Sequence, residues 1–201
     1  MYKFCMALVA LYYKIFFGTR YIGADNIPKQ GGLLICVNHL SNNDPVIVAG
    51  GVPRQLRFMA KKELFKVPVL AQIIKAFGAY PIDRSISDIS AVKLTLCILK
   101  NGDSLMMFPE GRRNKKFVAS GIKPGAATIA FKAGVPLLPV YIDGKYRLFG
   151  KTTVYFGNPV SPEKIEEVLK AAANSGENKN RIIAEFLYDI ICGAKKVHEV
   201  D

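Results

Sequence analysis

The feature that most constrains the fold is a short, unbroken apolar run, GLLICVN, at residues 32–38. A continuous run of this length is typical of a strand that is buried on both faces. Such strands belong to parallel sheets whose two faces are covered by helices. The run therefore favours an α/β architecture.

The rest of the chain alternates between strand-like and helix-like segments. Further strands are expected at residues 56–59, 79–82, 104–108, 136–142 and 152–156. Helices are expected at residues 4–17, 44–49, 69–77, 86–100 and 125–133, from 162 onward and at 177–194. In the helix at 86–100, Ile89, Val92, Leu96 and Leu99 share one face, which we expect to meet the core.

Length and element order together predict the fold class. The chain has 201 residues, of which 50% are hydrophobic and 22% charged, as expected for one globular domain. We expect a single α/β domain with a largely parallel or mixed central sheet flanked by helices. In such sheets, ligands bind beyond the carboxyl ends of the strands.

The charge balance favours anionic partners. Lys and Arg number 28 against 16 Asp and Glu, which gives a net charge of +12. Nucleic acid, an acidic membrane face, phosphorylated substrates and an acidic protein all fit this charge. The sequence has no recognition-helix, RNP-like or zinc-finger pattern, so we expect no nucleic acid. The four cysteines share no C-x-x-C spacing, so we expect no metal site and a reducing compartment.

The N-terminal segment is a candidate membrane-associated amphipathic helix. Residues 4–17 are apolar except for Lys14, and as a helix they would reach about 21 Å, short of the ~30 Å hydrocarbon core. Lys3 and Lys14 fall on one stripe, which suits a helix lying in the membrane interface. The alternative is a helix that packs on the domain core or on a partner.

A second basic stretch, residues 54–75, holds six Lys and Arg against one acid, Glu63, with apolar residues between them. That pattern suits docking on anionic lipid. A solvated face over an ordinary core is the alternative.

The first chemical motif is NHLSNND at residues 38–44, in which Asp44 follows His39 by five positions. An imidazole that is largely neutral at pH 7 can act as a general base, and a carboxylate on its other ring nitrogen would fix the tautomer. On one helix the two side chains would not share a face, but a strand–turn–helix path could bring them together. The alternative is that Asp44 simply caps the helix that begins at Pro45.

Two further motifs place arginines after strands. FPEGRR at residues 108–113, with Lys123 downstream, combines guanidinium groups with a glycine turn, which suits phosphate binding. GAYPIDR at residues 78–84 ends in Arg84. The alternative for the first motif is a solvated basic loop. The alternative for the second is that Arg84 forms a surface ion pair with Asp83. A G-x-S-x-G motif is missing from the sequence, so a nucleophilic serine on an elbow is not supported.

Taken together, these segments resemble the glycerolipid acyltransferase family, most closely its 1-acylglycerol-3-phosphate acyltransferases. The family pattern reads N-H-x-S-x-x-D, G-x-x-x-x-x-R, F-P-E-G-x-R and V-P-x-x-P-V. The corresponding blocks here are residues 38–44, 78–84, 108–113 and 135–140. The sequence departs from the family at Arg112, where Thr or Ser is usual, and at Pro81, where Phe is common. Both departures concern acyl-acceptor binding.

The resemblance implies a reaction and roles for individual residues. His39 would deprotonate the free sn-2 hydroxyl of lysophosphatidic acid, with Asp44 orienting the imidazole. The resulting oxygen would attack an acyl thioester of acyl carrier protein or coenzyme A and form phosphatidic acid, and no acyl-enzyme is needed. The thioester is a co-substrate, so no cofactor is expected.

The resemblance also implies an acyl-acceptor site. Glu110, Gly111 and Arg113 match the family's acceptor-site block. Arg84 matches a second phosphate-binding position, and Lys123 corresponds to a frequent basic position.

The expected organisation is a membrane-interface helix at residues 1–18 and an acyltransferase domain at residues 19–201. The enzyme would sit on the cytosolic face of the cytoplasmic membrane, as a peripheral or monotopic protein. Three alternatives stay open: transfer to glycerol 3-phosphate or another lysophospholipid, a non-catalytic module that binds anionic membranes, and a thioesterase.

Overall fold

The computed structural model describes residues 2–82, 89–114, 116–144 and 146–198, and places them in one α/β domain. Its sheet has seven strands in the order β1-β7-β6-β2-β5-β3-β4. Neighbouring strands are parallel except β6 and β7, which are antiparallel. The expected largely parallel or mixed sheet is therefore confirmed. The strands are β1 (Thr19–Ile22), β2 (Leu33–Val37), β3 (Leu56–Lys61), β4 (Ala79–Ile82), β5 (Ser104–Met107), β6 (Leu137–Gly144) and β7 (Thr152–Phe156).

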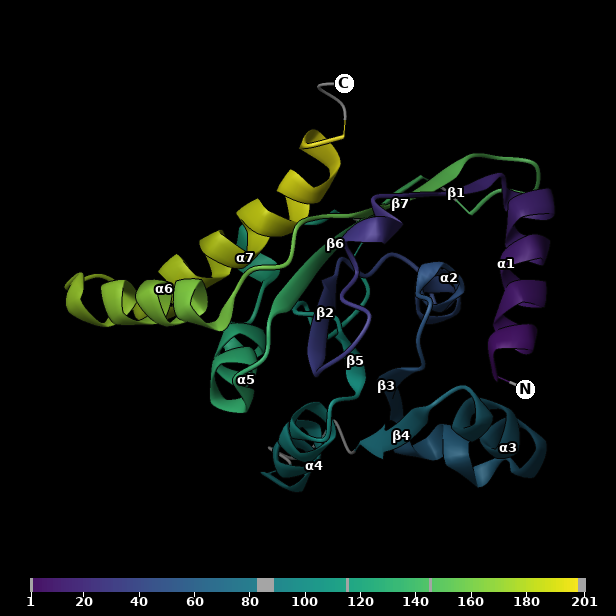
Figure 1. The fold of residues 1–201 in the computed structure, drawn as a ribbon, viewed down its shortest axis with the longest axis horizontal. Helices are drawn as coiled ribbons and strands as arrows, with labels where there is room; N and C mark the ends of the chain where they lie inside the picture. Colours follow the sequence, from purple (N-terminus) through teal and green to yellow (C-terminus); the bar gives the residue numbers. More distant parts are fainter. Residues whose placement is uncertain (1, 83–88, 115, 145, 199–201) are drawn as a thin grey trace.

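Helices flank this sheet on both sides (Figure 1). The α-helices are α1 (Tyr2–Phe17), α2 (Asp44–Gly51), α3 (Pro68–Ala76), α4 (Ile89–Lys100), α5 (Gly125–Ala133), α6 (Pro162–Asn174) and α7 (Lys179–Lys196). Short 3-10 turns are η1 (Ala24–Asn26), η2 (Lys62–Lys66) and η3 (Ala119–Gly121).

Strand β2 lies at the centre of the core. Each of its five residues is buried, as the unbroken apolar run predicts. Leu33, Ile35 and Val37 join a cluster with residues of α1 and α2. Leu34 and Cys36 join a second cluster with residues of α4, α5, α6 and α7. The strand thus separates two apolar layers, and its carboxyl end is held at a fixed point between them.

Two details of the fold differ from the sequence analysis. Strand β1 is an edge strand of four residues that the apolar pattern did not reveal. The expected core face of α4 is only partly correct: Leu99 is buried as expected, but Ile89 and Val92 are exposed and Thr95 is buried. The Thr95 hydroxyl lies 2.9 Å from that of Tyr80, and this hydrogen bond allows a polar residue to occupy the core side.

The other edge strand, β4, carries Pro81. A proline cannot donate a backbone hydrogen bond, and an edge position needs fewer of these bonds than a central one does. Pro81 is thus compatible with its place in the sheet.

Helix α1 stands beside α2 at one end of the molecule (Figure 1). Met6 and Tyr13 are buried against the core, and Ala10 approaches α2 where Gly50 leaves room. The outward side carries exposed apolar residues, namely Leu8, Leu11, Tyr12 and Ile15. Among the described residues, no helix has the length and apolar character needed to cross a membrane.

Candidate active site

Four neighbouring parallel strands bring polar residues to one edge of the sheet. His39 follows β2, Glu110 follows β5, Tyr146 follows β6, and Lys61 is the last residue of β3. Because β6, β2, β5 and β3 are adjacent and parallel, their carboxyl ends meet at this edge. This is where an α/β sheet binds its ligands.

The structure brings His39 and Asp44 into contact. His39 Nδ1 lies 2.8 Å from Asp44 Oδ2, and the same oxygen accepts hydrogen bonds from the backbone N–H groups of Leu40 (2.7 Å) and Ser41 (2.8 Å). The strand–turn–helix path considered for the motif therefore does bring the two side chains together. Asp44 is fully buried, and its carboxylate points back into the turn instead of capping α2, whose N-cap residue is Asn43.

This contact determines which ring nitrogen is left for chemistry. With a carboxylate at Nδ1, the tautomer that satisfies the pair carries its proton on Nδ1 and leaves a lone pair on Nε2. The ring stacks on Phe108, with centroids 3.9 Å apart and planes inclined by 16°. The imidazole is therefore held both through an edge atom and through one face.

Glu110 supports the backbone that carries His39. One oxygen of its buried carboxylate accepts the His39 backbone N–H at 2.7 Å, and the other accepts the Asn114 side-chain amide at 2.8 Å. The Asn114 backbone N–H in turn donates to the His39 carbonyl at 3.0 Å. Burial raises the pKa of Glu110 above its usual value, although these two hydrogen bonds act in the opposite direction. The contacts that the structure gives Glu110 thus tie two loops together.

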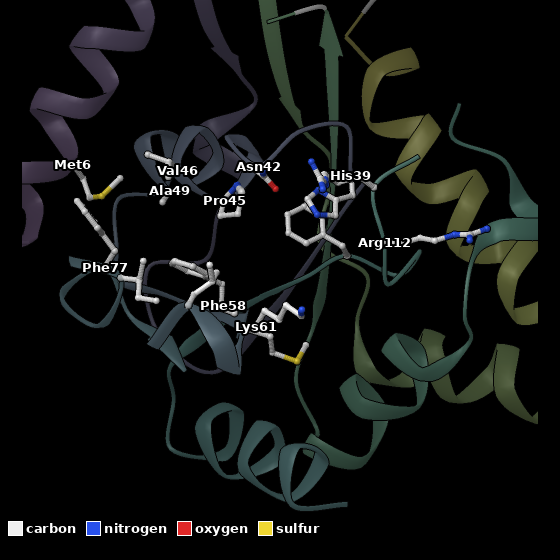
Figure 2. A pocket seen from close by; sticks show the side chains of 16 residues that line it. Met6, His39, Asn42, Pro45, Val46, Ala49, Phe58, Lys61, Phe77 and Arg112 are labelled. Carbon is white, nitrogen blue, oxygen red and sulfur yellow. The ribbon is translucent and has the colours of Figure 1, made fainter. Parts of the chain in front are cut away.

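Two cavities meet at His39. The larger, of about 840 Å³, is lined mainly by apolar side chains from α1, α2, β3 and α3, including Met6, Phe58 and Phe77. Figure 2 shows these three side chains on one side of the cavity and His39 on the other. The smaller, of about 280 Å³, is lined by His39, Phe108, Gly111, Lys123 and three methionines.

Three of the expected acyl-acceptor residues line these cavities, whereas the buried Glu110 lines neither of them. Arg113 lines the larger cavity, and Gly111 and Lys123 line the smaller one. Gly111 has a positive φ of 68°, and a Cβ added there would lie 3.4 Å from Lys123 Nζ. The left-handed backbone at this position favours glycine, and the Lys123 ammonium lies beside the turn that it forms. Arg84 lies outside the described residues.

Three further residues of this region were not among the expected site residues, although Arg112 was noted as a departure from the family pattern. Lys61 lines the large cavity, although the sequence placed it only within a basic stretch. Arg112 also lines it, but in the view of Figure 2 its side chain runs away from His39. Tyr146 donates a hydrogen bond from its hydroxyl to Asp44 Oδ1. Its position shortly after the expected strand at residues 136–142 is the sequence signal that could have pointed to it.

Comparison with known proteins identifies the class to which this fold and site belong. The family model described as Acyltransferase matches residues 18–143, which is more than half of the chain. The chain therefore belongs to the acyltransferase family, and the resemblance to the glycerolipid acyltransferases is confirmed.

Individual relatives agree with this placement. The chain is 35% identical over 187 residues to a 1-acyl-sn-glycerol-3-phosphate acyltransferase of Streptococcus pneumoniae, covering 89% of this chain and 69% of that one. It is 32% identical over 166 residues to the Bacillus subtilis enzyme of the same name, covering 80% and 82%. The crystal structure of the 1-acyl-sn-glycerophosphate (LPA) acyltransferase PlsC from Thermotoga maritima superposes with a TM-score of 0.67 at 24% identity, covering 98% of each chain. That likeness shows a shared fold.

Proposed function

We propose that this acyltransferase moves an acyl chain from a thioester to the sn-2 hydroxyl of 1-acyl-glycerol 3-phosphate, which forms phosphatidic acid. The names of its relatives support this acyl acceptor. The observation that carries the proposal is the His39–Asp44 pair, which lies where a large apolar cavity meets a smaller one lined by Lys123. Such a site can hold an acyl chain and a phosphate group on either side of one base.

The reaction needs no covalent enzyme intermediate. His39 Nε2 takes the proton of the sn-2 hydroxyl as its oxygen attacks the thioester carbonyl carbon. Asp44 keeps the ring oriented and stabilises the imidazolium that forms. As the carbon–sulfur bond breaks, the imidazolium returns the proton to the departing thiolate. The new carbon–oxygen bond is the ester bond of the product, and the enzyme returns to its starting state.

Basic residues around the site suit a phosphorylated acyl acceptor. Arg113 and Lys61 line the large cavity, and Lys123 lines the small one. We assign phosphate binding to Arg113 and Lys123, together with Arg84 on the strength of its motif. A guanidinium offers two parallel donors to a phosphate, so Arg113 suits the phosphate best. We place Gly111 at the same subsite because it lines the small cavity beside Lys123. We assign to Glu110 the support of the adjoining turn, through its hydrogen bond with the His39 backbone.

The large cavity suits the lipid chains. Its volume of about 840 Å³ is within the range of pockets that bury small ligands, and its wall is predominantly apolar. The leaving group can be either acyl carrier protein or coenzyme A, because both are acidic and the chain carries a net charge of +12.

We also propose that α1 lies in the interface of an anionic membrane. Its outward residues Leu8, Leu11 and Ile15 are more than half exposed, and Lys14 lies exposed beside them. Phe149, on the loop between β6 and β7, is 75% exposed and its ring lies 6.3 Å from that of Phe16. Apolar residues next to a cation match the boundary between acyl chains and acidic headgroups. The larger cavity is partly lined by Met6 of the same helix, so lipid could enter from that side.

A donor-by-acceptor assay tests the proposed function. Thiol release from acyl carrier protein and coenzyme A thioesters is measured with lysophosphatidic acid, with glycerol 3-phosphate, with another lysophospholipid and with no acyl acceptor. We expect release that requires lysophosphatidic acid and yields phosphatidic acid. Release without any acyl acceptor would indicate a thioesterase, and no release under any condition would indicate a binding module. Preference for a different acyl acceptor would reassign the substrate.

A further inference from the structure

The catalytic carboxylate has a fourth hydrogen-bond donor, which comes from a distant part of the chain. Oδ2 of Asp44 accepts from His39 Nδ1 and from two backbone N–H groups. Oδ1 accepts from the hydroxyl of Tyr146, which is 102 positions away in the sequence. Because Asp44 is fully buried, each of these donors replaces a water molecule that the carboxylate would otherwise bind.

The loop that carries Tyr146 is fixed at both ends. It follows β6, which is paired in parallel with β2, the strand that leads to His39. Three residues later, the Phe149 backbone N–H donates to the Phe16 carbonyl at the end of α1 at 2.6 Å. Figure 1 shows the β6–β7 connection reaching that end of α1. The position of the hydroxyl is thus set by the sheet and by α1, independently of the turn that holds Asp44.

We propose that Tyr146 is a positioning residue, which fixes the rotamer of Asp44 and through it the orientation of the His39 ring. This inference rests on the proposed function of the His39–Asp44 pair. Tyr146 does not line either of the two cavities described above, so it acts on the reaction through Asp44 and not on the substrates. Burial, followed by the proximity of Asp44, raises the pKa of Tyr146 well above its ordinary value. The phenol therefore stays protonated and remains a donor throughout the working pH range.

The test is Tyr146→Phe, with Tyr21→Phe as its matched control. The Tyr21 hydroxyl also makes a partly buried hydrogen bond in this region, but it donates to the Ile47 carbonyl and does not touch the dyad. We expect Y146F to lower kcat about tenfold and to leave the KM for lysophosphatidic acid within about twofold. Y21F should keep the wild-type kcat. Equal kcat values for wild type, Y146F and Y21F would overturn the proposal.

A double-variant cycle distinguishes action through Asp44 from a general effect. In an Asp44→Ala background, adding Y146F should change the rate less than about twofold, because the carboxylate that it positions is gone. A further tenfold loss in that background would contradict the proposal. If Y146F alone fails to fold, the Y146F/D44A protein decides the matter. Recovery of folding would show that the hydroxyl serves the buried carboxylate, whereas continued failure would contradict that role.

Wild type and His39→Ala are measured in the same assay, which separates two kinds of failure. An inactive wild type or an active H39A would refute the proposed function itself. An active wild type with an inactive H39A and an unaffected Y146F would refute only the role of Tyr146.

Discussion

The His39–Asp44 pair shows how far single residues can be assigned from the sequence. The motif at residues 38–44 predicted that an imidazole and a carboxylate would meet through a turn, and the 2.8 Å contact has that geometry. Local spacing was sufficient because both residues lie in one segment. Tyr146 could not be found in this way, since only the parallel pairing of β6 with β2 brings it to Asp44.

Glu110 yields a prediction about stability and pH. Burial raises its pKa in the folded state, so the folded protein holds the proton more tightly than the unfolded chain does. The stability that this contributes is fully present below the unfolded pKa and is lost as pH rises through the higher folded value. Glutamine cannot ionise, so the stability of Glu110→Gln relative to wild type should increase as pH rises from about 4 to about 7.

Chemical denaturation of both proteins across that pH range measures the effect. Altered hydrogen bonds in E110Q would change its stability by the same amount at every pH. The informative quantity is therefore the slope of the stability difference against pH. Glu167→Gln, at an exposed position, is the control for the exchange of Glu for Gln itself. A stability difference for E110Q that is flat, or that decreases with pH, would contradict the raised pKa.

At the scale of elements, long periodic segments were predictable and short or ambiguous ones were not. The apolar run at 32–38 became β2, and the helix expected from residue 162 onward became α6, which Ser161 caps through its side chain. Strand β1 has only four residues and pairs in parallel with β7, so its partner lies far away in sequence. In α4, apolar residues occur on several sides, and the buried side includes Thr95, whose hydroxyl is hydrogen-bonded to Tyr80.

Helix α1 carries a prediction about membrane binding. Replacing Leu11 and Ile15 with Glu places two charges on its exposed apolar side and should weaken binding to phosphatidylglycerol vesicles by at least about tenfold. The matched control is Val92→Glu, which puts a charge at an exposed apolar position of α4. Vesicle sedimentation measures the binding. If both variants bind like the wild type, α1 is not the membrane contact.

At the scale of the whole molecule, composition predicts that partners are anionic, but it does not show which surface of the protein would bind them. Arg54 belongs to the basic stretch at residues 54–75, yet its guanidinium donates to the carbonyls of Pro28, Gly31 and Gly102 at 3.0, 2.6 and 2.7 Å. Arg57 Nε lies 3.3 Å from Asp103 Oδ2, so this guanidinium is also paired within the fold. A count of charges along the sequence therefore includes groups that hold the fold together, and only the structure separates these from cations that face outward.

The net charge of +12 still predicts how binding responds to salt. Each cation near an anionic surface contributes about 1 kcal/mol, and salt screens this attraction. Raising the ionic strength should weaken binding to phosphatidylglycerol vesicles steeply, whereas binding to neutral phosphatidylcholine vesicles should be weak and nearly insensitive to salt. Binding that is equal for both lipids at every salt concentration would show that charge has no part in it.

The measurement that tests the central claim most directly is the turnover of His39→Ala, compared with its equilibrium binding of lysophosphatidic acid. Removal of a positioned base should lower turnover by about 10²–10⁴-fold, and both the fold and the affinity for the lipid should stay close to wild type. An H39A protein that transfers acyl chains at the wild-type rate would contradict the mechanism.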